Sequence, residues 1–111
     1  MVGQSKNVIT SQYYEDHLVE ILDYGIEAFG YIQARKYFNI ISRFVEKLET
    51  DYTYHSECRH LATKSRMYRN IILDAHLIIY RITKERIEVL DIIHSASSVR
   101  KIREVRKIIT L

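Results

Sequence analysis

Two arginines and two histidines in the second half of the chain are the side chains best suited to chemistry. Arg69 and Arg81 lie within apolar, strand-like segments, and His76 and His94 stand at the ends of such segments. If these segments pair in a sheet, we expect Arg69, Arg81 and His94 to gather at one end of it, with His76 nearby. A histidine beside arginines can exchange protons during ribonucleotide cleavage, or it can bind an acidic partner.

The same residues also have a structural interpretation, which we prefer to catalysis. Carboxylates such as Glu88 or Asp91 would hold Arg69 and Arg81, and His94 would bond a backbone group where its strand ends. Structural ion pairs shift the pKa values of their side chains as catalytic sites do, so a cluster of this kind does not by itself indicate catalysis. We therefore assign no catalytic residue, and Arg69, Arg81 and His94 are candidates only if the protein is a nuclease.

A second cluster has the residue types of a metal site without its spacing. His55, Cys58 and His60 follow one another closely, with Glu57 between them. A closed zinc site needs four ligands in a tetrahedron, usually in paired spacings, and one loop with three donors does not supply them. We expect no metal and no other cofactor.

The end of the chain is strongly basic. Residues 98–111 hold five cations and one acid, Glu104, for a net charge of +4. The cations are Arg100, Lys101, Arg103, Arg106 and Lys107. Residues 56–111 as a whole carry a charge of +6, against −3 for residues 1–55. Such a surface suits nucleic acid, an acidic groove on a target enzyme or an acidic peptide, although a solvated helix would look the same.

Length and composition limit the class of protein. The chain of 111 residues, 47% of them hydrophobic, suits one domain with one modest core. No stretch approaches the roughly 18 apolar residues of a membrane span, and residues 1–10 lack the apolar core of a signal peptide. The lone cysteine, Cys58, cannot form an internal disulfide. We expect a cytoplasmic protein that needs no membrane.

The elements that position these residues begin with a short strand at 7–10 and a helical hairpin at 11–49. Ser11 can cap the first helix, and Gly30 ends it. Apolar residues recur at helical spacing in both helices, as far as Phe29 in the first and from Ala34 to Leu48 in the second. Each helix therefore needs an apolar surface to cover.

A three-stranded meander follows at 66–94, after a loop at 50–56. Its middle strand is apolar on both faces, and the third is mixed, with Ile87, Val89 and Ile93 on one side and Leu90 and Ile92 on the other. A sheet of this kind is covered twice. The helical hairpin can cover one face, which leaves the other for a partner or for a last helix at 98–109. That helix would bury Val99, Ile102, Val105 and Ile109.

This order of elements resembles the RelE/ParE family of bacterial toxins from about residue 8 onward. In the helices the resemblance is carried by Leu18, Ile21, Tyr24, Ile26, Ala34, Tyr37, Ile41, Phe44 and Leu48. In the strands it is carried by Arg69, His76, Ile78, Ile79, Tyr80, Arg81, Ile87, Glu88, Val89, Leu90, Ile92, His94 and Ala96. The second series is similar to the ParE branch, in which an arginine opens the strand before the β-hairpin and a Tyr-Arg pair closes the middle strand of the sheet.

The chain also departs from that branch. Ser95 follows the final histidine, and Ser97 occupies a position where ParE-like chains often have arginine. The nuclease branch, similar to RelE, places cations on the sheet and near the end of the third strand. Here those positions are Ile71, Ile72, Ser95 and Ala96. Without cations, a scissile phosphate lacks an evident stabiliser.

The resemblance implies an α+β fold, a helical hairpin packed on an antiparallel sheet with a basic C-terminal helix. It implies the toxin of a type II toxin–antitoxin pair of the plasmid-stabilising kind, which binds DNA gyrase and is neutralised by a cognate antitoxin. A homodimer or a hetero-oligomer with the antitoxin would then form. The expected target- or partner-binding residues are Arg69, His76, Tyr80, Arg81, His94, Arg100, Lys101, Arg103, Arg106 and Lys107. Two alternatives stay open, a ribosome-dependent messenger RNA endoribonuclease and a non-toxic assembly partner of the same fold.

Overall fold

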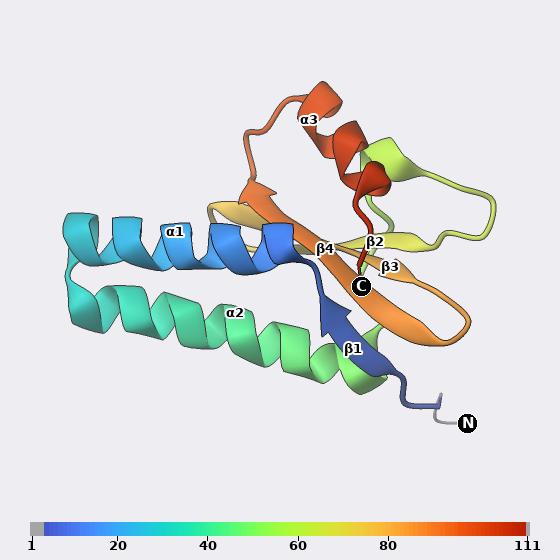
Figure 1. Cartoon of the computed structure of the whole chain (residues 1–111), viewed down its shortest axis with the longest axis horizontal. Coiled ribbons are helices and arrows are strands. Elements are labelled where there is room, and N and C mark those ends of the chain that lie inside the picture. The colour runs from blue at the N-terminus through green and yellow to red at the C-terminus, as the bar shows by residue number, and fades with distance from the viewer. Residues whose placement is uncertain (1–3, 111) are drawn as a thin grey trace.

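A computed structural model describes residues 4–110 (Figure 1). The elements in chain order are β1 (Asn7–Thr10), α1 (Gln12–Phe29), α2 (Tyr31–Asp51), β2 (Tyr68–Ile72), β3 (His76–Ile82), β4 (Arg86–His94) and α3 (Val99–Glu104), with short 3-10 turns at Arg59–Leu61 and Val105–Lys107. The predicted short strand, helical hairpin and meander are confirmed. The predicted loop at 50–56 is shorter, because α2 continues to Asp51.

The four strands form one sheet in the order β1-β4-β3-β2. The last three strands are antiparallel neighbours, as the meander requires. β1 joins the other side of β4 in parallel, with Val8 opposite Ile87. The sheet is therefore mixed and not wholly antiparallel, because the long helical hairpin separates β1 from its partner and allows a parallel return.

Both faces of the sheet are buried, which confirms the expectation from its apolar strands. The face under the helical hairpin buries Tyr14, Leu18, Ile41, Val45, Leu48, Ile71, Ile78, Tyr80, Ile87, Val89 and Ile92. The opposite face buries Cys58, Leu61, Ile79, Leu90, Ile93, Ile102 and Val105. The second cover thus comes from the chain's own loop before β2 and from its C-terminal segment (Figure 1).

A β-bulge corrects the faces predicted for the last strand. The register of β3 and β4 shifts between Ile79 and Tyr80, which leaves Leu90 without a paired residue. After an extra residue the alternation of side chains changes phase. As a result Ile92, and not Ile93, lies on the same face as Ile87 and Val89.

The helical hairpin is fixed at its start and close-packed in its outer half. The Ser11 hydroxyl accepts a hydrogen bond from the Tyr14 backbone N–H at 3.0 Å and donates to the Leu90 carbonyl, so it caps α1 and joins it to β4. At Gly30, φ is +88°, a conformation that glycine adopts without strain between the two helices. Gly25 lies so close to α2 that a Cβ there would be 3.1 Å from the Ala34 Cβ.

The last helix is shorter than the predicted 98–109. Ser98 caps it as expected, but α3 ends at Glu104 and the chain is extended by Ile108. Ile102 and Val105 are buried as predicted, whereas Val99 is 40% and Ile109 is 77% exposed. Arginines of the sheet bind backbone carbonyls of this segment, which favours an extended end over another helical turn. Between residues 4 and 110, no helix is long and apolar enough to cross a membrane.

We predict that Gly25→Val lowers the free energy of unfolding by about 1–3 kcal/mol, because the added methyl groups force α1 away from Ala34. Urea unfolding monitored by circular dichroism measures the change. Ala28→Val, on the exposed side of the same helix, is the control and should lose only the helix-propensity difference, about 0.6 kcal/mol. Equal losses in the two variants would contradict close packing at Gly25.

Candidate functional site

The predicted gathering of Arg69, Arg81 and His94 is wrong. In the antiparallel register Arg69 lies opposite Tyr80, whereas His76 lies opposite His94. The arginines therefore occupy one end of the sheet and the histidines the other. The reason is the length of β3, which begins at His76 and reaches Arg81 only near its far end.

Arg81 belongs to a network that holds the C-terminal segment. Its guanidinium lies 2.7 Å from Oε1 of the buried Glu88, and Arg86 lies 2.9 Å from Oε2. Arg81 also donates to the Ile108 carbonyl at 3.2 Å, and the Thr110 hydroxyl donates to Glu88 at 2.8 Å. Burial raises the pKa of the Glu88 carboxyl, but hydrogen bonds from Thr110 and both arginines outweigh it and lower the pKa. The structural role expected for Arg81, a pair with Glu88, is thus present.

Arg69 is held by carbonyls and not by a carboxylate. Its Nη1 donates to Thr53 O at 3.1 Å and to His55 O at 2.9 Å, just beyond the end of α2. Tyr80 has no surface to offer a partner, because it is fully buried and its hydroxyl donates to Tyr52 O at 2.6 Å. The partner-binding role predicted for Tyr80 therefore does not fit this fold.

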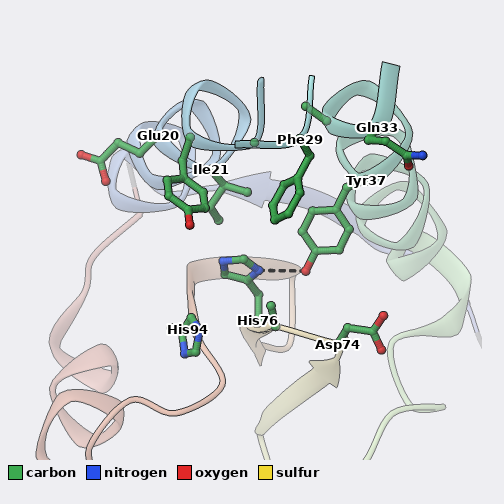
Figure 2. A pocket seen from close by; sticks show the side chains of 12 residues that line it. Glu20, Ile21, Phe29, Gln33, Tyr37, Asp74, His76 and His94 are labelled. Atoms are coloured by element: carbon green, nitrogen blue, oxygen red, sulfur yellow. Dashed lines mark hydrogen bonds between the residues drawn. The ribbon is translucent and has the colours of Figure 1, made fainter. Parts of the chain in front are cut away.

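The histidine end of the sheet opens into a groove beneath the helical hairpin (Figure 2). The Tyr37 hydroxyl lies 2.8 Å from His76 Nδ1, which ties α2 to the start of β3. His94 lies on the other side of His76, with ring centroids 5.8 Å apart. Figure 2 shows His76 between the tyrosine and the second histidine, facing the helices.

A backbone hydrogen bond indicates the tautomer of His94. A backbone N–H, of Ala96, donates to His94 Nδ1 at 3.0 Å, so the neutral ring carries its proton on Nε2. Burial lowers the pKa of His76, and the neighbouring His94 lowers it further. A neutral His76 can accept a hydrogen bond from the Tyr37 hydroxyl at Nδ1 and present Nε2–H to the groove.

The groove has a volume of about 760 Å³. It is lined by Glu20, Ile21, Tyr24, Gly25, Phe29, Gln33, Ala34, Tyr37, Asp74, Ala75, His76 and His94. Its outer wall is the end of the hairpin, which projects beyond the sheet (Figure 1). Tyr24 is 67% exposed, Phe29 68% and Ile32 71%, so the hairpin carries its apolar residues past the surface that could cover them. Exposed apolar patches of this kind mark interaction sites.

A smaller hollow continues from the groove toward α3. It shares His76 and His94 with the groove and is also lined by His17 and Lys101. His17 Nδ1 lies 2.6 Å from an oxygen of Asp91, a contact between α1 and β4. The five cations predicted to bind a partner in the C-terminal segment are exposed on and just after α3, and of these five only Lys107 has an acidic partner among residues 4–110, Glu104 at 3.0 Å. An apolar surface therefore leads into a basic one.

The loop with His55, Cys58 and His60 contributes to the fold. Cys58 is buried in the second core, and burial raises the pKa of its thiol. His55 packs edge-on against Tyr80 with ring centroids 6.2 Å apart, and burial lowers its pKa. Within the described part of the chain, no group of three His, Cys, Asp or Glu side chains could hold a metal ion.

Sequence reasoning missed the groove and the part of Tyr37 in it. The apolar stripe of α1 continues to Phe29, and the stripe of α2 begins soon after Gly30. This continuation of both apolar stripes up to the turn between the helices was the available signal, but it does not show which part of the stripes the sheet leaves uncovered. His17 and its contact with Asp91 had no sequence signal, because the residues are 74 positions apart.

Comparison with known proteins identifies one family. The family model of the ParE toxin of type II toxin-antitoxin system, parDE, matches residues 8–99. Among solved structures, the chain is similar to one described as "Chromosomal ParDE TA system from P. aeruginosa", with a TM-score of 0.67 and 16% identity over 83% of this chain and 98% of that one. No curated protein matches. The structural likeness confirms the fold predicted from the resemblance.

We predict that stability falls as the pH drops below about 6.5, the ordinary pKa of histidine. The pKa of His76 is lower in the folded chain, so the unfolded chain binds the proton more readily and acid favours unfolding.

Tyr37→Phe should lower the free energy of unfolding by about 1 kcal/mol at pH 7, because it removes the hydrogen bond to His76. Urea midpoints at several pH values measure both effects.

The controls for this prediction use the other histidines. His76→Gln should flatten part of the pH dependence, and His55→Gln a further part, because burial lowers both pKa values. If His76→Gln shows the same slope between pH 7 and pH 5 as the unmodified chain, His76 is not a source of the acid sensitivity.

Proposed function

The chain belongs to the ParE toxin family of type II toxin–antitoxin systems, and on that basis we propose that it inhibits DNA gyrase by binding and is neutralised by an antitoxin. The observation that carries the proposal is the continuous surface from the apolar groove to the basic helix α3. This surface is shaped for a macromolecule, since its outer wall is an exposed helical hairpin.

The antitoxin is the partner we propose for the groove. Apolar side chains of an amphipathic segment would cover Tyr24 and Phe29, whose rings are largely exposed. Acidic side chains of the same segment would then reach Lys101 and the other cations of α3, which lie beyond the histidines. A segment that folds on binding can follow such an extended track. The related P. aeruginosa structure is described as a ParDE system, which supports a partner of this kind.

Binding and not cleavage is the activity we propose toward the target. Arg81 is paired with Glu88, and Arg69 lies at the end of the sheet away from His94. Within residues 4–110, no arginine of the sheet therefore stands beside His94 to stabilise a pentacoordinate phosphate, and the cation that shares a hollow with His94 is Lys101 of α3. The exposed cations of α3 are suited to an acidic surface on gyrase.

We expect the purified chain to block DNA supercoiling by gyrase in a concentration-dependent manner while leaving messenger RNA intact in a translating extract. The double reversal Arg100→Glu with Arg103→Glu should weaken inhibition about tenfold, because it places acids where the target needs cations. Agarose gels of plasmid topoisomers measure the inhibition. Arg43→Glu with Lys47→Glu makes the same change in charge on the exposed side of α2 and should retain the inhibition.

Two outcomes would contradict the proposal, and each would support one of the alternative functions. Cut messenger RNA, with cutting lost in His94→Ala, would establish the endoribonuclease alternative. Absence of both activities, together with normal growth on induced expression, would point to a non-toxic assembly partner of the same fold.

The antitoxin proposal has its own test. The probe is the product of an adjacent reading frame, if that product is short and acidic. We expect it to bind the chain and to lose about tenfold in affinity for Tyr24→Glu, which places a charge in the groove. Tyr31→Glu is the matched control, because Tyr31 is similarly exposed at the hairpin end but does not line the groove. Equal losses in the two variants would contradict docking in the groove.

A further inference from the structure

A further, basic pocket lies beside the β3–β4 turn. Figure 1 shows this turn at the end of the sheet away from the tip of the helical hairpin. We call this basic pocket the turn pocket. It has a volume of about 450 Å³ and is lined by Thr53, Ser65, Arg66, Met67, Arg69, Ile82, Thr83 and Lys84. Its walls come from the segment after α2, from the start of β2 and from the end of β3. The proposed functions above make no use of it.

Arg69 gives the pocket a rigid cation with unused donors. Its Nε donates to Arg66 O at 3.0 Å, and both protons of Nη1 bind carbonyls of the segment after α2. A guanidinium has five N–H groups, so the two on Nη2 have no acceptor among residues 4–110. No carboxylate in that range lies within 4.0 Å of the guanidinium. The charge is thus fixed in place and uncompensated.

Two further cations lie beside it. Arg66 is exposed, and its nearest carboxylate oxygen belongs to Glu57 at 3.8 Å, a distance too long for a strong pair. Its φ of 57° is unusual for a residue other than glycine, and in this conformation its carbonyl accepts from Arg69. Lys84 is exposed in the turn and has no ion pair within the described ranges. No acidic residue lines the pocket.

The rest of the lining includes an apolar wall, which suits a ligand larger than a bare anion. Met67 and Ile82 are half-buried and offer an apolar wall. The two residues are joined by a backbone hydrogen bond of 2.8 Å, so this wall is part of the sheet and not a mobile loop. The volume exceeds what one phosphate group fills. A ligand with a charged end and a flat or apolar body would use both parts of the lining.

We propose that the turn pocket binds a nucleotide through its phosphate group. Arg69 supplies the two free N–H groups of Nη2, and Arg66 and Lys84 add mobile charge around the same phosphate. The sugar or base lies against Met67 and Ile82. The nucleotide is either free in solution or part of a nucleic-acid strand, and in both cases the chemistry of recognition is the same.

The test is a titration of the ¹⁵N-labelled full chain followed by NMR. The three probes are inorganic phosphate, adenosine monophosphate and a short single-stranded oligonucleotide. We expect saturable shifts of the amides of residues 65–69 and 82–84, and of the Arg69 Nε–H signal. Adenosine monophosphate should bind more tightly than inorganic phosphate because of the apolar wall. An oligonucleotide that binds more tightly still identifies a strand as the source of the phosphate, and equal affinity identifies the free nucleotide.

Variants separate this pocket from general attraction to a basic protein. Arg66→Ala with Lys84→Ala should weaken binding of adenosine monophosphate about tenfold, since two charge-assisted contacts are lost. Arg43→Ala with Lys47→Ala removes the same charge from α2 and should leave binding unchanged. Arg69 also binds backbone carbonyls that hold the fold together, so Arg69→Lys can weaken binding by disturbing the structure. Its effect is therefore interpreted only together with that of the Arg66→Ala, Lys84→Ala double variant. Shifts spread evenly over all exposed cations, equal loss in the two double variants, or no saturation by about 10 mM would overturn the proposal.

Discussion

The structure depends on a sheet that is apolar on both faces and must be covered on both. The central strands β3 and β4 bury residues toward the helical hairpin on one side and toward the C-terminal segment on the other. Each fully buried aliphatic side chain contributes roughly 1.5–3 kcal/mol, so neither cover is dispensable in a chain of this size. The first cover is made of two long helices. The second consists of a short helix and two irregular segments, which cannot form a large core unaided.

The network around Glu88 holds the second cover in position. Its carboxylate lies on the face opposite the hairpin and is almost completely shielded from water, which would be costly without compensation. Two arginines and the Thr110 hydroxyl supply that compensation, and the arginines also bind carbonyls of the C-terminal segment. A charged cluster therefore fixes the position of the extended tail, where few apolar contacts would. This explains how the fold accommodates a charged side chain at a buried strand position.

The sequence predicted the elements well because each depends on local signals. Ser11, Gly30 and the two-sided apolar pattern of the middle strand determine where the hairpin begins, where it turns and how the sheet is covered. The candidate site was predicted less well, because it depends on register and on distance. To place Arg69, Arg81 and His94 relative to one another, one must know the register of β2 and β4 on β3. The periodicity of apolar residues does not contain that information. The bulge at Leu90 likewise arises from pairing, since nothing in the residue itself distinguishes it from its neighbours.

The place where the helical hairpin begins accounts for where function can lie. Ser11, at the start of α1, is bound to Leu90 in the middle of β4, and only four residues of that strand follow Leu90, about 13 Å. The 18 residues of α1 extend about 27 Å, so the helix runs past the end of the strand. The surplus projects as an exposed apolar wall over the histidine end of the sheet, and the groove forms beneath it. At the opposite end α2 stops at Asp51, and Arg69 and Tyr80 bind carbonyls of the segment that follows it. One end of the molecule therefore offers a large apolar surface and the other a smaller basic pocket, and the two share no lining residue.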